Sequence, residues 1–223
     1  MDWLYTLSGF AVGAIVGLTG VGGGSLMTPL LVLLFGIHPA TAVGTDLLYA
    51  ALTKSGGSVV HGRKGHIDWK IVGLLASGSV PATALTIAVL SQLPKQSPEA
   101  VHVISISLGV ALLLTACAII FRKHILSYAL AHDQSFVHRH LAPVTIAVGA
   151  ILGVLVSISS VGAGALGVAA LFFLYPRLPA VQIVGTDIAH AVPLTLVAGI
   201  GHATLGNVSW DLLGALLVGS LPG

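Results

Sequence analysis

Charged residues are scarce in this sequence. Asp, Glu, Lys and Arg make up only 7% of its 223 residues, against 56% hydrophobic residues, whereas about a quarter of a soluble domain is charged. None of the four occurs between Asp2 and Asp46 or between Arg139 and Arg177. Each uncharged stretch is long enough to cross a bilayer twice, since one span needs about 20 residues. The composition therefore excludes a water-soluble domain and predicts several membrane spans in contact with lipid.

Cysteine is almost absent as well. Cys117 is the only one and lies in an apolar run, which excludes a disulfide framework and a cysteine metal cluster. The formal charge of +2 and the pI near 8.9 do not indicate a nucleic-acid partner, because the basic residues form no stripe. They lie in short connections between apolar runs, where they indicate membrane topology. The start Met1-Asp2-Trp3 lacks the basic residues of a signal peptide, so we expect the first apolar run to remain as a helix.

Apolar runs predict nine helices, at residues 3–20, 26–37, 40–60, 70–92, 100–121, 141–159, 165–176, 181–200 and from 209 onward. The second and the seventh are too short to span a bilayer. Each follows a run of small residues, GVGGGS at 20–25 and SVGAGA at 160–165. We therefore expect each short helix to begin at a glycine-rich break near the middle of the membrane.

The two breaks belong to an internal repeat. The sequence VGTD occurs at residues 43–46 and again at 184–187. Upstream, AVGAI occurs at residues 11–15 and again at 147–151. The offset of 141 between the VGTD sequences also relates His61 to His202, Trp69 to Trp210 and Pro81 to Pro222.

Five segments in the first half force the second half to enter the membrane upside down. The connections at 61–70 and 122–140 carry three bases each, whereas residues 201–209, the counterpart of the first, carry no charge. Because basic loops stay in the cytoplasm, equivalent loops then lie on opposite sides, as in an inverted repeat. The amino terminus and the connections at 91–99 and 201–209 are expected outside.

The predicted fold is an all-α polytopic membrane protein of two inverted repeats. The first membrane repeat covers residues 1–123, a cytoplasmic connection covers 124–140, and the second repeat covers 141–223. The second repeat stops just after Pro222, whereas the first continues for about 40 residues beyond the matching proline. We therefore expect the natural protein to be longer.

The glycine-rich breaks are candidate anion sites. A non-helical stretch at membrane depth is tolerated where it is buried in protein or lines a watery cavity. The start of a short helix there offers free N–H groups and the positive end of its dipole. The alternative is that the glycines only allow close helix packing. The candidate substrate-binding residues at the breaks are Gly22, Gly23, Gly24, Ser25, Ser160, Gly162 and Gly164.

Two carboxylates, Asp46 and Asp187, lie in apolar segments, where insertion of one costs about 2.5–3.5 kcal/mol. Together with Thr45 and Thr186, they are predicted to cap backbone groups at the neighbouring breaks or to take part in ion coupling. Substrate contact is least favoured, because carboxylates repel anions. Asp187 and His190 are three residues apart on one helical face and could pair.

One lysine and two histidines complete the candidate set. Lys54 is predicted to snorkel to the cytoplasmic surface, or alternatively to offer its ammonium group to an anion in the pore. His61 and His202 end equivalent segments and are interpreted as interface or gate residues. Four histidines of the central connection show no metal-ligand spacing and are expected in a solvated loop, namely His124, His132, His138 and His140.

These motifs resemble those of the TauE/SafE sulfite exporter family. The resemblance rests on GVGGGS at 20–25 followed by a short proline-containing helix, on PATAVGT at 39–45, and on the repeated VGTD. It covers essentially the whole chain, although the last segments of the family are absent. It implies a bacterial inner-membrane carrier of sulfite, of sulfonates such as sulfoacetate, or of related sulfur compounds.

We therefore predict a transporter, not an enzyme, that exports sulfite or a small organosulfonate across the bacterial inner membrane without a cofactor. One alternative is a permease or channel for another small anion, such as thiosulfate or a carboxylate. Another is an intramembrane hydrolase that uses Ser25 or Ser160 with His190 or His202 as the base. The oligomeric state is left open, and a homo-oligomer is allowed.

Overall fold

The computed structural model describes residues 3–19, 24–92, 98–131 and 140–220, and all regular structure in these residues is α-helical. The helices are α1 (Trp3–Thr19), α2 (Gly24–Leu33), α3 (Pro39–Arg63), α4 (Trp69–Leu90), α5 (Pro98–Ile120), α6 (Arg122–Ala131), α8 (Leu141–Ser159), α9 (Ala165–Leu174), α10 (Ala180–Thr204) and α11 (Trp210–Ser220). The predicted all-α class is confirmed, with α6 as an addition.

Four helices, α4, α5, α8 and α10, are long and apolar enough to cross a membrane. Helix α3 is as long as α10, with 25 residues, but it carries Asp46, Lys54 and several glycines. Its residues from Ala42 to Ala51 and the side chain of Lys54 are buried in protein, so Asp46 and Lys54 do not face lipid. Helices α2 and α9 have only ten residues each, as expected for the two short segments.

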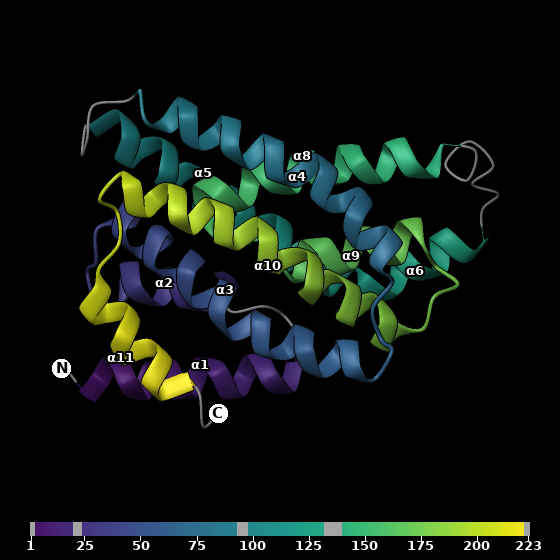
Figure 1. The fold of residues 1–223 in the computed structure, drawn as a ribbon, viewed down its shortest axis with the longest axis horizontal. Helices are drawn as coiled ribbons and strands as arrows, with labels where there is room; N and C mark the ends of the chain where they lie inside the picture. Colours follow the sequence, from purple (N-terminus) through teal and green to yellow (C-terminus); the bar gives the residue numbers. More distant parts are fainter. Residues whose placement is uncertain (1–2, 20–23, 93–97, 132–139, 221–223) are drawn as a thin grey trace.

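The helices form three packed pairs (Figure 1). Helices α3 and α10 lie side by side in the centre, α4 and α8 pack on one side of them, and α1 and α11 pack on the other. Each pair joins one helix from the first half of the chain to one from the second half. The short helix α2 packs on α3, while α9 packs on α10 and α6. The interior of the molecule is therefore built at the junction of the two halves.

The outer pairs approach closely through glycines, as small residues allow in membrane helices. A Cβ atom on Gly149 would overlap the carbonyl oxygen of Leu75, and one on Gly9 would overlap that of Leu216. Gly9 thus has the same contact as Gly149. The sequence alignment of the AVGAI runs, which matches Gly149 with Gly13, is wrong by one helical turn. A shift of four residues returns to nearly the same helix face, which makes such an error easy.

The basic residues gather at one end of the bundle. The connection between α3 and α4 and helix α6 lie at the same end in Figure 1, and the turn from α10 to α11 lies at the other end. Arg63, Lys64, Arg122 and Lys123 belong to the first end. The exposed indole of Trp69 lies at that end too, whereas the exposed Trp3 and Trp210 begin their helices at the opposite end, as membrane-interface residues do.

The connection predicted at residues 124–140 is helical over its first half. Helix α6 follows α5 after a single turn at Phe121 and packs against α9. His124 is exposed on α6, and His140 precedes α8. His132 and His138 lie outside the described residues. Within the described ranges, no group of three or more His, Cys, Asp or Glu side chains is placed to hold a metal ion.

Candidate functional site

The second glycine-rich break separates α8 from α9. Ser160 has φ 59°, Gly162 has φ 115° and Gly164 has φ 141°. The last two values are readily adopted only by glycine, so these glycines are needed for the shape of the break. In the first break, Gly22 and Gly23 lie outside the described residues, and Gly24 and Ser25 form the start of α2.

The start of α9 opens onto this break. The amide of Gly167 donates to the carbonyl of Gly162 at 3.2 Å, and that of Val168 donates to Gly164 at 2.8 Å. The amides of Ala165 and Leu166 form no hydrogen bond within the described part of the chain. Free amides at a helix start suit an anion, so the break can offer two N–H donors.

Asp46 joins the two halves at the break. Its Oδ2 accepts a hydrogen bond from the Thr28 hydroxyl of α2 and another, of 2.8 Å, from the Ser160 hydroxyl. The residue is fully buried. Its Oδ1 has no partner among the described residues. Asp46 thus ties the short helix of the first half to the break of the second.

Lys54 does not snorkel to the surface, so that prediction is wrong. Its side chain is only 8% exposed, and its Nζ donates to the carbonyl oxygen of Ala163, 109 residues away in the break. It interacts electrostatically with both Asp46 and Asp187. The side chain is held inside because a carbonyl acceptor and two carboxylates offset the cost of burying the ammonium group.

Asp187 lies against α9 and is not paired with His190. It is 2% exposed, and its Oδ1 has no hydrogen-bond partner in the described part of the chain. A Cβ atom added at Gly167 would overlap that oxygen. The carboxylate therefore occupies space that only glycine leaves open. An unpaired buried carboxylate oxygen is costly unless it takes up a proton or a cation.

His190 instead reaches across to α4, where its Nε2 and the Ser79 hydroxyl share a hydrogen bond of 2.9 Å. Both residues are buried. The residues 141 positions away from this pair are Tyr49 and Ser220, and Tyr49 interacts electrostatically with Ser220. Because a tyrosine takes the place of the histidine there, the pair is interpreted as a helix-to-helix link. Ser160, a nucleophile of the hydrolase hypothesis, donates to Asp46 and not to a histidine.

The threonines of the two VGTD sequences do cap backbone amides, but not those of the breaks. The Thr45 hydroxyl accepts from the Ser209 amide at 3.1 Å, and the Thr186 hydroxyl accepts from the Asp68 amide at 3.0 Å. Each threonine therefore caps the start of a helix in the opposite half. The interpretation that these threonines cap the breaks is wrong, because tertiary packing brings other helix starts to them.

The two segment-ending histidines also occupy matching places. A Cβ on Gly44 would approach His202, and one on Gly185 would approach the ring of His61. His202 is fully buried, and its Nε2 donates to the carbonyl of Ser157 at 2.8 Å. His61 is partly exposed and its ring lies 5.8 Å from that of His66. The two are equivalent in position but not in their surroundings.

A polar cavity of about 590 Å³ lies at the end of the bundle opposite the bases. It is close to the Thr45 to Ser209 bond, since Ser209 is part of its wall. Other polar side chains in the wall are Tyr5, His38, Thr41 and Asp211.

Sequence reasoning missed three residues of this region, namely Thr28, Ser79 and Gly167. Ser79 could have been found, because Gly-Ser-x-Pro occurs at residues 78–81 and again at 219–222. Thr28 and Gly167 have no such signal. Their importance comes only from the carboxylates that pack against them.

A bundle with several apolar spans, a non-helical break and buried charges beside it defines a multi-pass membrane transporter. Two proteins of Bacillus subtilis (strain 168), named "Probable membrane transporter protein YjnA" and "Probable membrane transporter protein YdhB", are 41% and 31% identical to this chain. They match 97% and 96% of it, and the matches cover 85% and 84% of their own lengths. A "Probable membrane transporter protein" of Xylella fastidiosa (strain Temecula1) is 24% identical over 97% of the chain and 79% of its own length.

The model of the family described as "Sulfite exporter TauE/SafE" matches residues 5–223. The chain belongs to this family. No solved structure matches it.

Proposed function

We propose that this transporter exports sulfite or a small organosulfonate anion across the bacterial inner membrane. The observation that carries the proposal is the buried Lys54 ammonium group, which donates to Ala163 in the break. A cation placed beside free helix-start amides offers complementary donors for the oxygens of a small anion. The family description names sulfite as the cargo.

In this proposal the anion lies between the two breaks. Lys54, the Ser160 hydroxyl and the backbone from Gly162 to Gly164 contact it from one side, and the Ser160 hydroxyl would then donate to the anion in place of Asp46. The run from Gly22 to Ser25 is the proposed counterpart in the first repeat. The anion would replace Ala163 as the partner of the Lys54 ammonium group. The polar cavity beside Ser209 is then the route to the outside.

Export needs no further energy source for an anion. With the cytoplasm negative, each negative charge that moves outward gains about 2.3 kcal/mol per 100 mV. A divalent anion gains twice as much. Coupling to a proton or another cation would therefore set direction or control and is not required as a driving force.

We further propose that the two halves form an inverted repeat. The reciprocal bonds of Thr45 to Ser209 and of Thr186 to Asp68 support this arrangement, because each half then contributes the same contact at opposite ends of the bundle. Inverted repeats place their substrate site where the two repeats meet, near the middle of the membrane. The central pair of α3 and α10 is that junction.

The topology can be tested with single cysteines in a Cys117→Ser background. Lys64 and Thr204 are both exposed, at opposite ends of the bundle. We expect Lys64→Cys to react with an impermeant maleimide only in inside-out vesicles and Thr204→Cys only in intact cells, because basic connections stay in the cytoplasm. Reaction of both cysteines from the same side would contradict the inverted repeat.

The two carboxylates are expected to respond differently to amidation. Asp46→Asn keeps a side-chain oxygen for Thr28 and Ser160, so its flux should stay within about fivefold of wild type, as for a loss of about 1 kcal/mol. Asp187→Asn should remove the dependence of flux on the proton gradient, because the Asp187 carboxylate accepts no hydrogen bond in the described part of the chain, whereas that of Asp46 accepts two. Flux is measured at fixed membrane potential with and without a proton gradient. Equal, mild effects at both positions would leave membrane potential as the only driving force.

The substrate is tested by uptake of radiolabelled sulfite into inside-out vesicles that contain the purified transporter. Saturable, protein-dependent uptake is expected, and sulfoacetate should compete with it. Stronger competition by thiosulfate or a carboxylate would reassign the substrate, and flux that does not saturate would indicate a channel. No flux for any of these anions would reject the proposal.

A further inference from the structure

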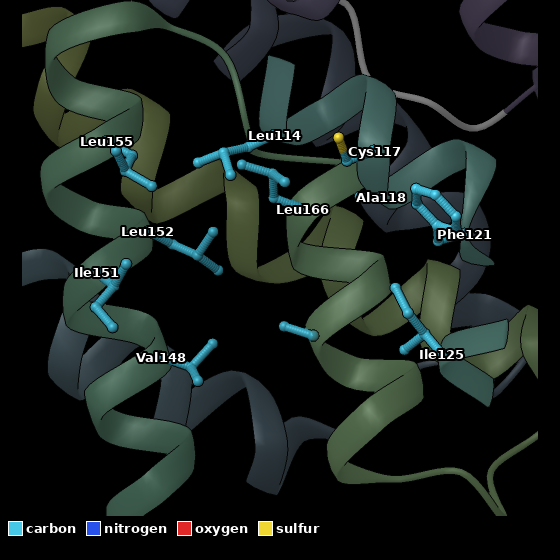
Figure 2. A pocket seen from close by; sticks show the side chains of 11 residues that line it. Leu114, Cys117, Ala118, Phe121, Ile125, Val148, Ile151, Leu152, Leu155 and Leu166 are labelled. Atoms are coloured by element: carbon cyan, nitrogen blue, oxygen red, sulfur yellow. The ribbon is translucent and has the colours of Figure 1, made fainter. Parts of the chain in front are cut away.

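An apolar groove opens on the outside of the bundle. It has a volume of about 420 Å³ and lies between α5, α6, α8 and α9. Figure 2 shows Ile151, Leu152 and Leu155 of α8 on one side and Phe121 and Ile125 on the other. Eleven side chains line it, none of them charged.

The groove faces the lipid. Ile151 is 60% exposed, Phe121 is 52% exposed, and Cys117 is exposed as well. Ala118 and Ala170 in its wall leave space because each side chain is only a methyl group. An empty groove would deprive its wall of dispersion contacts, so in a bilayer it is filled by an apolar chain.

Two bases begin α6, next to lining residues of the groove. Arg122 and Lys123 are exposed and lie between Phe121 and Ile125, which line the groove. The guanidinium carbon of Arg122 lies 4.6 Å from the centre of the Phe172 ring, which holds it in place. The sequence has no Asp or Glu between Glu99 and Asp133, and neither base forms an ion pair within the described residues.

We propose that the groove is a binding site for an anionic glycerophospholipid, with one acyl chain in the groove and the phosphate at Arg122 and Lys123. The apolar wall fits the acyl chain, and the two unneutralised bases fit the anionic headgroup. They lie at the basic end of the bundle, where such pockets bind anionic lipid headgroups.

The native cysteine provides a reporter for this site. The full-length chain, labelled with bimane at Cys117, is placed in vesicles that contain phosphatidylglycerol or phosphatidylcholine with brominated acyl chains. Brominated phosphatidylglycerol should quench the label at about 30-fold lower mole fraction than brominated phosphatidylcholine, since each base near the surface adds about fivefold.

The charge is tested with the double variant Arg122→Gln, Lys123→Gln, which should lose this preference. The matched control is Arg63→Gln, Lys64→Gln, which removes two adjacent exposed bases at the same end of the bundle and should keep it. Native mass spectrometry with unlabelled lipids gives a second measurement, in which Ala170→Phe should reduce retained phosphatidylglycerol at least fivefold.

Three results would overturn the proposal. The first is equal quenching by the two lipids in the wild type. The second is a preference that survives in the Arg122 and Lys123 double variant. The third is efficient cross-linking of two copies through Cys117 by a short bismaleimide in vesicles, which would make the groove an interface between copies of this chain.

Discussion

Replacing Lys54 by methionine is expected to reduce sulfite flux by about 10-fold to 100-fold. Loss of a charged hydrogen bond in a buried site costs about 1.5–3 kcal/mol, and each 1.4 kcal/mol is a factor of ten. The loss falls on transport because Lys54 is the buried cation beside the break. Flux into inside-out vesicles, normalised to the amount of inserted protein, measures it.

Two variants control for charge and for folding. Lys70→Met removes the same charge from an exposed position at the start of α4 and should leave flux unchanged. Lys54→Arg keeps a cation and should retain more flux than Lys54→Met, although the larger guanidinium group fits the site less well. If Lys54→Met protein inserts normally and transports at the wild-type rate, Lys54 does not bind the anion.

Replacing Gly164 by valine is expected to reduce flux at least tenfold while the protein still inserts into the membrane. The φ of 141° at Gly164 is one that L side chains rarely adopt, and forcing such a residue there costs about 1–3 kcal/mol. The backbone relieves this strain by shifting, which displaces the Ala163 carbonyl and the start of α9. The arrangement around Lys54 is therefore lost.

The matched control is Gly109→Val in α5. A Cβ atom at Gly109 meets nothing within 4 Å, and the residue lies inside a regular helix, so insertion and flux should stay near wild type. A thermal-unfolding measurement in detergent separates a local effect from general destabilisation. Wild-type flux in Gly164→Val would show that the shape of this break does not matter for transport.

Much of the architecture could be read from the sequence because its signals are local. The helices follow from apolar runs, and the bounds differ from the predicted ones by no more than four residues at most ends, with α6 as the missed element. Helix α6, with the sequence RKHILSYALA, is charged at its start and apolar later. The sequence interpretation placed this segment in a solvated loop. The break at residues 160–164 was predicted because glycine allows backbone angles that end a helix.

The composition also determined the class of protein. Scarce charge, long uncharged stretches and a repeated VGTD sequence are enough to indicate a membrane protein with an internal repeat, since lipid tolerates few ionised groups. No knowledge of the packing is needed for that step.

Only the tertiary structure decided what the polar residues touch. Asp46 meets Ser160, Lys54 meets Ala163, and Thr45 meets Ser209 across more than 100 residues of sequence. A helical pattern gives the face on which a side chain lies but not the segment that packs against that face. The burial of Lys54 depends on such a segment, because its ammonium group stays inside only where a distant carbonyl group accepts its hydrogen bond.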